Sequence, residues 1–134
     1  MHPEAKRLND LSEQIIGAAI DVHRALGPGL LEGPYEECLC HELQKRGLKF
    51  ERQKPLPLVY ETVRLPCAYR MDLVVENSIV VEIKAIARWE RVHEAQLISY
   101  LKLSGLHLGL MLNFNVKHLS RDGVMRKVSD FPES

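Results

Sequence analysis

The chain has 134 residues, of which 46% are hydrophobic and 27% charged, an ordinary composition for a globular protein. Its 18 basic and 18 acidic residues cancel, which excludes a strongly basic nucleic-acid binder and leaves only local patches or a metal to attract a polyanion. There is no signal peptide and no apolar run long enough to span a bilayer, and the three cysteines have no framework spacing. We therefore expect a single cytoplasmic domain over residues 1–134, with no membrane partner.

The first third of the chain predicts two helices. Apolar residues recur at helical spacing from about residue 10 to residue 26, where Asp10 can cap the helix with Glu13 as its capping-box partner. Gly27-Pro28-Gly29 ends this helix. A second helix is expected over residues 31–46, with Pro34 in its first turn, where the missing N–H has no partner to lose.

Prolines interrupt the strand-like pattern that follows. We expect a strand over residues 48–53 and an irregular hairpin or edge segment over residues 56–65. Pro55, Pro57 and Pro66 fall in this region, and a proline cannot donate to the ladder of a central strand.

Residues 69–84 predict a tight β-hairpin. Strand side chains alternate faces, and every odd position from Met71 to Val75 and from Ile79 to Ile83 is apolar. A three-residue loop at residues 76–78 keeps the two faces unmixed, because it pairs Val75 with Ile79 and therefore Asp72 with Glu82. The pattern places two carboxylates and the Lys84 ammonium side by side at one end of the hairpin.

Two neighbouring carboxylates repel each other, and a cation relieves that repulsion. Oxygen ligands on rigid strands suit Mg²⁺ or Mn²⁺, with the remaining positions filled by water and a substrate phosphate. Lys84 would then orient the attacking water or stabilise charge on the phosphate. The alternative is an exposed Asp/Glu/Lys salt-bridge patch, since E-x-K occurs often by chance.

The last third of the chain predicts a helix and two strands. The helix covers about residues 90–103, with His93, Gln96 and Tyr100 on one stripe that either faces solvent or supports the carboxylates. The apolar run 106–114 predicts an interior strand, and residues 124–128 a final strand after an Asp122-Gly123 turn. We expect the last six residues to be disordered. The element order α-α-β-β-β-β-α-β-β indicates an α/β fold with a mixed sheet.

Four motifs that follow one another along the chain resemble those of a known superfamily. Asp72 and Glu82-Ile83-Lys84 resemble the PD-(D/E)XK nuclease motif, although Arg70-Met71 replaces its proline. The segment from Gly29 to Tyr35 matches the G-x-x-E-x-x-Y signature of the bacterial GxxExxY proteins of that superfamily, and Gln96 to Tyr100 resembles the Q-x-x-x-Y motif of RecB-type nucleases. The resemblance covers roughly residues 8–128.

The resemblance implies a restriction-endonuclease-like core, a mixed central β-sheet flanked by helices, that cleaves nucleic acid, with DNA as the expected substrate. It implies that Asp72 and Glu82 bind Mg²⁺ or Mn²⁺ together with the Ile83 carbonyl, and that Lys84 assists the attacking water. Glu32 would support the metal, directly or through water, and Gln96 with Tyr100 would support the site or contact the nucleic-acid backbone. Two alternatives stay open: a catalytically silent nuclease-fold module for binding or assembly, and an unrelated α/β binding protein. A homodimer or another protein partner is also open.

Overall fold

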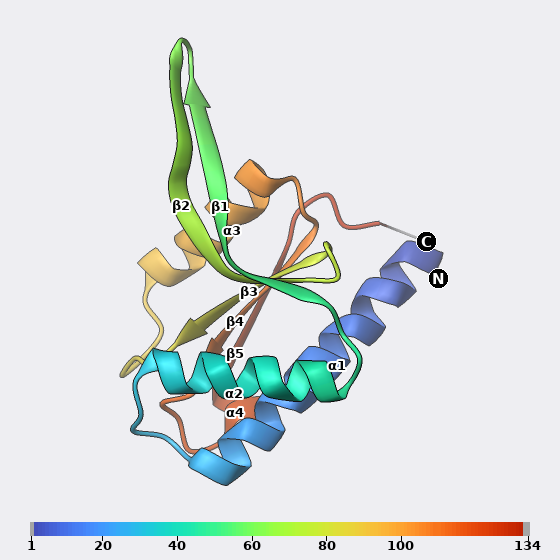
Figure 1. The fold of residues 1–134 in the computed structure, drawn as a ribbon, viewed down its shortest axis with the longest axis vertical. Coiled ribbons are helices and arrows are strands. Elements are labelled where there is room, and N and C mark those ends of the chain that lie inside the picture. The colour runs from blue at the N-terminus through green and yellow to red at the C-terminus, as the bar shows by residue number, and fades with distance from the viewer. Residues whose placement is uncertain (1, 133–134) are drawn as a thin grey trace.

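The computed structural model describes residues 2–132 and contains a five-stranded sheet between helices (Figure 1). The elements are α1 (Pro3–Leu26), α2 (Glu32–Lys45), β1 (Phe50–Tyr60), β2 (Val63–Val75), β3 (Ile79–Lys84), α3 (Arg91–Ser104), β4 (Leu108–Asn113), α4 (Leu119–Asp122) and β5 (Val124–Val128). The strands lie in the sheet in chain order, and only the β3–β4 pair is parallel. The expected α/β fold with a mixed sheet flanked by helices is confirmed.

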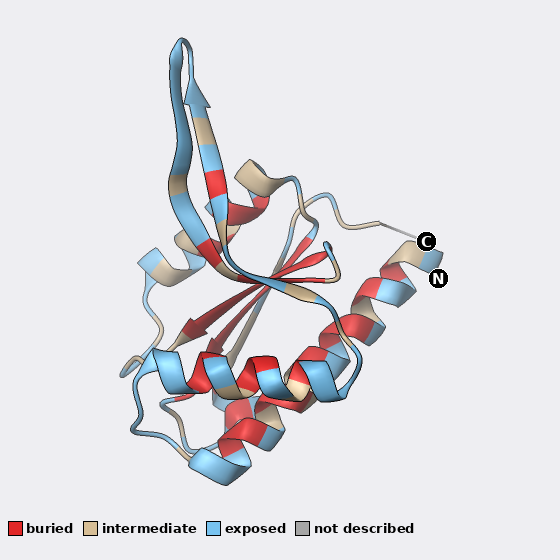
Figure 2. Ribbon diagram, in the orientation of Figure 1, coloured by how far each residue is buried: buried red, intermediate tan, exposed pale blue. Residues whose placement is uncertain are grey.

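Helices cover both faces of the sheet. The helices α1 and α2 pack on the face that carries Leu73, Val75 and Ile83, and α3 packs on the face that carries Val74 and Val80. All residues of β4 are buried, as the apolar run predicts for an interior strand. Figure 2 shows buried residues along β3, β4 and the inward stripes of the helices.

The first helix starts seven residues earlier than the sequence pattern predicts, so the expected start at Asp10 is wrong. His2 caps α1, and its Nδ1 accepts a hydrogen bond of 3.0 Å from the Glu4 N–H. Ala5 and Leu8 are buried and extend the apolar stripe backwards, which gives the earlier turns a core to pack on. Asp10 lies inside the helix and pairs with Lys6 at 2.7 Å.

The proline-interrupted region forms two long strands instead of a strand and a separate hairpin. Strand β1 is an edge strand, where prolines cost no ladder hydrogen bond on the solvent side. Strand β2 pairs with β3 only over Leu73 to Val75, so the distal part of the β1–β2 hairpin has no third strand. We call residues 57–70 the arm, which projects from the body (Figure 1).

The C-terminal region holds one further difference. A short helix, α4, precedes β5, while β5 has the expected bounds. Within the segment expected to be disordered, the Ser129 N–H donates to the His107 carbonyl at 3.0 Å and Phe131 packs against the core. Residues 133–134 lie outside the described residues. None of the helices over residues 2–132 is long and apolar enough to cross a membrane.

Gly109 allows α3 to lie close to β4. A Cβ atom at this position would come within 2.8 Å of Leu97 Cδ1 and 3.4 Å of Leu101 Cδ2. We expect Gly109→Val to lower the free energy of unfolding by about 1–3 kcal/mol, because the added carbons overpack a buried interface. Urea unfolding measures this, with Gly33→Ala as the control, since nothing lies within 4 Å of a Cβ there. Equal stability of the two variants would contradict the prediction.

Candidate active site

The β2–β3 hairpin opens at one end, and the two carboxylates lie at the opening. Val75 pairs with Ile79 across a loop in which Glu76 and Asn77 both have φ of 52°, which confirms the predicted loop and register. The backbone ladder ends at the Leu73–Val81 pair. Asp72 and Glu82 are the next residues in the same register, so the structure brings them together as the alternation predicts.

Carboxylates replace the backbone partners at this opening. The Asp72 N–H donates to Glu82 Oε2 at 2.7 Å, and the Ile83 N–H donates to Asp72 Oδ2 at 2.8 Å. Each strand therefore supplies a backbone donor for the carboxylate of the other strand. The reciprocal bonds fix both side chains without using all of their oxygens.

Met71 does not share the face of Leu73 and Val75, and this part of the alternation prediction is wrong. It packs in the cluster on the α3 side of the sheet, together with Leu56. Beyond the opening, β2 no longer has β3 as a neighbour, and β1 contains a left-handed residue, so the remaining two-stranded ribbon twists away from the plane of the sheet.

Burial makes the carboxylate pair electrostatically unfavourable. Glu82 is 3% exposed, and burial followed by the charge of Asp72 raises the pKa of its carboxyl to about 8. Burial also raises the pKa of Asp72 above its ordinary value, although the Ile83 N–H, the Gln53 amide and the Lys84 charge oppose this. At neutral pH the pair therefore holds a proton or requires a cation.

Lys84 is half-buried at the end of β3, next to the pair. Its charge lowers the pKa of both carboxyls, and within residues 2–132 it forms no ion pair with either of them. Asn113 lies opposite Lys84 in the parallel β3–β4 pair, and its side chain accepts from the Ile86 N–H at 3.0 Å and donates to the Ile86 carbonyl at 3.1 Å. Asn113 thus fixes the chain directly after Lys84, a role that its place at a strand end does not reveal.

Glu32 is exposed and is the first residue of α2, where the sequence predicts it. Burial is the main cause of the raised pKa of Asp72, and the charge of Glu32 adds to it, whereas the hydrogen bonds of that carboxyl oppose it. Tyr35 holds the loop before the helix, because its hydroxyl donates to the Gly27 carbonyl at 2.5 Å and accepts from the Leu30 N–H at 3.1 Å. The structure therefore brings the start of α2 near the carboxylate pair.

Reasoning from the sequence missed a polar group between α2 and β1. Glu36 is 9% exposed, and its carboxylate accepts from Arg52 Nη2 at 2.8 Å and from Gln53 Nε2 at 3.0 Å. The same Gln53 nitrogen lies 3.4 Å from Asp72 Oδ1. No spacing rule links these residues, because they come from different elements and meet only in the tertiary structure.

The α3 helix presents Gln96 and Tyr100 to the site. Gln96 Nε2 donates to the Tyr100 hydroxyl at 3.0 Å, and the Tyr100 ring lies 5.7 Å from that of Tyr69. Burial is the main cause of the raised pKa of Tyr100, and the charges of Glu82 and Asp72 add to it. This proximity contradicts the salt-bridge-patch alternative, which requires the helix to be distant. His93 caps the helix instead, accepting from the Glu90 N–H at 2.9 Å.

Comparison with known families agrees with this geometry. A model of the PD-(D/E)XK nuclease superfamily matches residues 9–127. The chain belongs to the PD-(D/E)XK nuclease superfamily. The curated proteins and the solved structures compared with the chain contain no match. The matched range includes the reciprocal pair Asp72 and Glu82 and the neighbouring Lys84.

PD-(D/E)XK nucleases typically use divalent metal ions, and the donor set here fits such an ion. Asp72 Oδ2 and Glu82 Oε2 are engaged by backbone N–H groups, whereas Asp72 Oδ1 has only the 3.4 Å contact to Gln53. These are hard oxygen donors, which suit Mg²⁺ or Mn²⁺. Among the described residues, no group of three or more His, Cys, Asp or Glu side chains could hold a metal, so further ligands would be a carbonyl and water.

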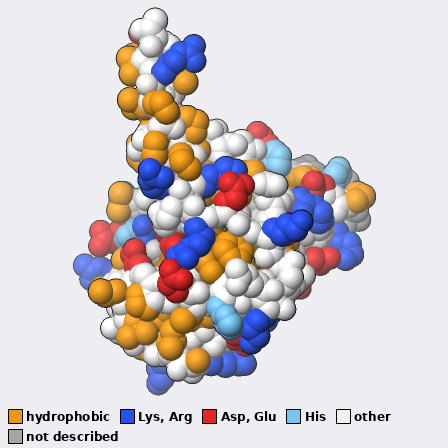
Figure 3. Space-filling model, in the orientation of Figure 1, with side chains coloured by type: hydrophobic (Ala, Val, Ile, Leu, Met, Phe, Trp, Pro, Cys, Tyr) orange, Lys and Arg blue, Asp and Glu red, His pale blue; other side chains and the backbone are white. Residues whose placement is uncertain are grey.

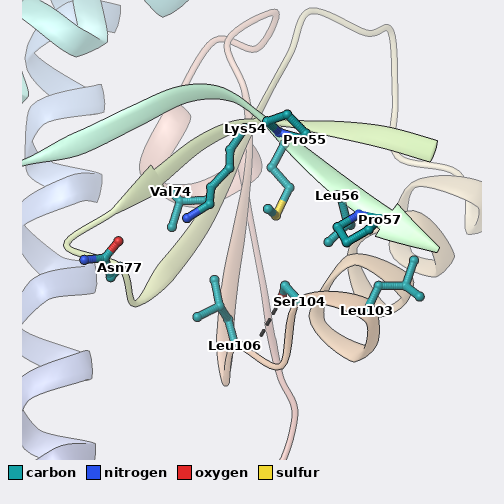
Figure 4. A pocket seen from close by; sticks show the side chains of 10 residues that line it. Lys54, Pro55, Leu56, Pro57, Val74, Asn77, Leu103, Ser104 and Leu106 are labelled. Atoms are coloured by element: carbon teal, nitrogen blue, oxygen red, sulfur yellow. Dashed lines mark hydrogen bonds between the residues drawn. The ribbon is translucent and has the colours of Figure 1, made fainter. Parts of the chain in front are cut away.

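A separate cavity of about 250 Å³ lies between the hairpin and α3 (Figure 4). Its lining includes Leu56, Met71 and Leu103 with the stem of Lys54, and it contains none of the site carboxylates. The cavity therefore belongs to the packing of the end of α3 against β1 and β2 at the root of the arm, and not to the candidate active site.

The raised pKa of Glu82 predicts a pH-dependent stability. Folding raises this pKa from 4.5 to about 8, so the folded state holds the proton more tightly than the unfolded chain. The resulting stability is complete below pH 4.5 and is lost as the pH rises to about 8. In EDTA, we expect the free energy of unfolding to fall between pH 5 and pH 8 by an amount on the order of 3 kcal/mol.

The variant Glu82→Gln tests this effect, because it removes the titrating group and keeps an acceptor for the Asp72 N–H. We expect urea unfolding of this variant to lose most of the pH dependence and to be more stable than the wild type at pH 8. Glu13→Gln, on the exposed face of α1, is the control and should keep the wild-type profile. A Glu82→Gln profile as steep as that of the wild type would contradict the assignment.

Proposed function

We propose that the protein is a Mg²⁺- or Mn²⁺-dependent nuclease that hydrolyses phosphodiester bonds, with DNA as the expected substrate. The observation that supports this most is the reciprocal hydrogen bonding of Asp72 and Glu82 at the open end of the hairpin, beside Lys84, in a chain of the PD-(D/E)XK superfamily. The segment from Gly29 to Tyr35 further supports membership of the bacterial GxxExxY group, acting as a single domain.

The free carboxylate oxygens of Asp72 and Glu82, with the Ile83 carbonyl, would hold the ion. Such an ion supplies electrostatic stabilisation of the negative charge that develops on the phosphate. Glu82 must lose its proton before it can bind the ion, so its raised pKa makes ion binding stronger toward pH 8. Glu32, at the start of α2, would complete the ligand shell through water.

Lys84 would orient the attacking water and donate to a non-bridging phosphate oxygen, because over residues 2–132 its ammonium forms no ion pair that competes for it. The Tyr100 hydroxyl, held by Gln96, would donate to the backbone of the bound strand. Arg88 and Arg91 are exposed on the segment that follows Lys84 and would contact neighbouring phosphates. Trp89 is less suited to stack on a base, since its Nε1 donates to the Asp122 carbonyl at 3.1 Å.

A catalytically silent binding or assembly module is the alternative function. The exposed apolar side chains of the arm favour it, because Tyr60 is 68% and Val59 57% exposed, and such surfaces commonly contact other proteins. Figure 3 shows hydrophobic side chains gathered along the arm, with basic side chains near its tip and its root. A homodimer or a different protein would be the partner. This alternative predicts a stability that does not respond to Mg²⁺ or Mn²⁺.

A cleavage assay separates the two functions. The substrates are circular and linear DNA, double- and single-stranded, with an RNA strand for comparison, in Mg²⁺, Mn²⁺ or EDTA. We expect cleavage only with the metal ions, and a loss of about 100-fold or more in rate for Asp72→Asn and for Lys84→Gln. Asp72→Asn keeps an acceptor for the Ile83 N–H, so the loss would not reflect unfolding.

Two exposed positions outside the site provide controls. Lys102→Gln on α3 and Glu13→Gln on α1 remove the same charges and should cleave at the wild-type rate. Cleavage that survives both site substitutions would refute the proposal. No cleavage, together with no change of melting temperature in Mn²⁺, would favour the silent module.

A further inference from the structure

Gln53 has a backbone conformation that its side chain does not favour. Its φ is 49°, in the left-handed region. This conformation is strained for residues with a Cβ atom, such as glutamine, and so lowers the stability of the fold. The other non-glycine residues with positive φ over residues 2–132 lie in turns or bends, whereas Gln53 lies inside strand β1. Glycine, asparagine or aspartate would adopt this conformation with less strain.

The backbone conformation of Gln53 places its side chain between two carboxylates. Arg52 pairs with Leu73 and Lys54 with Met71, so the left-handed residue stands opposite Asp72. Its side-chain nitrogen lies 3.0 Å from Glu36 Oε1 and 3.4 Å from Asp72 Oδ1. The amide therefore bridges a buried carboxylate of α2 and the candidate metal ligand of β2.

The chemistry of an amide suits this bridge. The two hydrogens of the Gln53 amide nitrogen serve one acceptor each, and they add no charge to a site that already has two carboxylates. Asparagine would relieve the backbone strain, but its side chain is one methylene shorter than that of glutamine. A positively charged side chain at this position would compete with the metal ion. The Gln53 carbonyl lies 3.4 Å from Arg70 Nη1, which provides it with a donor.

We propose that Gln53 is a positioning residue of the metal site, which holds Asp72 Oδ1 in place through its bridge to Glu36. This inference rests on the proposed metal-dependent function and adds to it a residue outside the superfamily motif. In this strained conformation of β1 the amide reaches both carboxylates. Gln53 acts through Asp72 and does not contact the reacting phosphate.

Two substitutions separate the backbone from the side chain. Gln53→Ala removes the amide and keeps the strain, whereas Gln53→Gly removes both. At an ordinary strand position glycine is less stable than alanine, but at this φ we expect the order to reverse, with the glycine variant melting roughly 3–5 °C higher. Both variants should bind Mn²⁺ about tenfold or more weakly than the wild type in calorimetric titration at pH 8.

Glu61 provides a matched control. It also has a positive φ, of 51°, but lies in the turn at the tip of the arm. Glu61→Gly should likewise melt above Glu61→Ala, with both variants keeping the wild-type affinity for Mn²⁺. If the role of Gln53 were merely structural, the Gln53 variants would also keep the wild-type affinity for Mn²⁺.

The outcomes distinguish this inference from the proposed function. If the wild type binds Mn²⁺ and Gln53→Ala binds it equally tightly, the inference is overturned but the proposed function is not. Absence of Mn²⁺ binding by the wild type itself would overturn both. Weakened binding in both Gln53 variants, with unchanged binding in both Glu61 variants, would establish the positioning role.

Discussion

The two reciprocal hydrogen bonds between β2 and β3 are the constraint on which the rest of the site depends. Where the backbone ladder stops, the Asp72 and Ile83 N–H groups would lack partners, and the Glu82 and Asp72 carboxylates satisfy them. The same contacts hold two like charges side by side in a buried place. At this end of the sheet both backbone N–H groups are hydrogen-bonded, but the negative charge of the two carboxylates is not neutralised. Such a site attracts a cation.

The surrounding elements maintain this arrangement from three directions. Asn113, on the parallel neighbour of β3, fixes the chain after Lys84, and α3 packs Tyr100 in the cluster that contains Val74 of β2 and Val80 of β3. On the other side of the sheet, Tyr35 stacks on Phe114 with ring centroids 4.5 Å apart and fixes the loop before α2. The candidate site is therefore built on helices and strands. Of the exposed residues proposed to extend it, Glu32 and Arg91 begin α2 and α3, and Arg88 lies in the loop before α3.

The sequence pattern alone was enough to predict those parts of the candidate site whose residues lie close together in the chain. The alternation over residues 69–84 determines one loop length, because other lengths mix the faces, and this places Asp72 opposite Glu82 without tertiary information. The stripe of Gln96 and Tyr100 likewise follows from helical spacing. What the pattern could not supply is non-local: Gln53 and Glu36 meet through the packing of α2 on β1, and a side chain such as Met71 changes face where the sheet loses a strand.

The errors in element bounds have the same origin. Asp10 followed by Glu13 satisfies a capping rule, but the burial of Ala5 and Leu8 against the sheet stabilises two more turns of helix. Prolines argued against a long strand, but they are tolerated because β1 turned out to be an edge, which depends on the strand order of the whole sheet. Propensity and capping are short-range signals, and tertiary burial overrides them.

The arm has a consequence for how this fold can diverge. Its residues pair only with each other beyond the Leu56–Tyr69 pair, through Leu58 with Leu65 and Tyr60 with Val63. Insertions or deletions of residue pairs at its tip would therefore leave the register of the core strands and the carboxylates unchanged. The arm ends at Arg70, two residues before Asp72 in the chain, so its length and surface can change what approaches the candidate site while the carboxylate pair stays fixed.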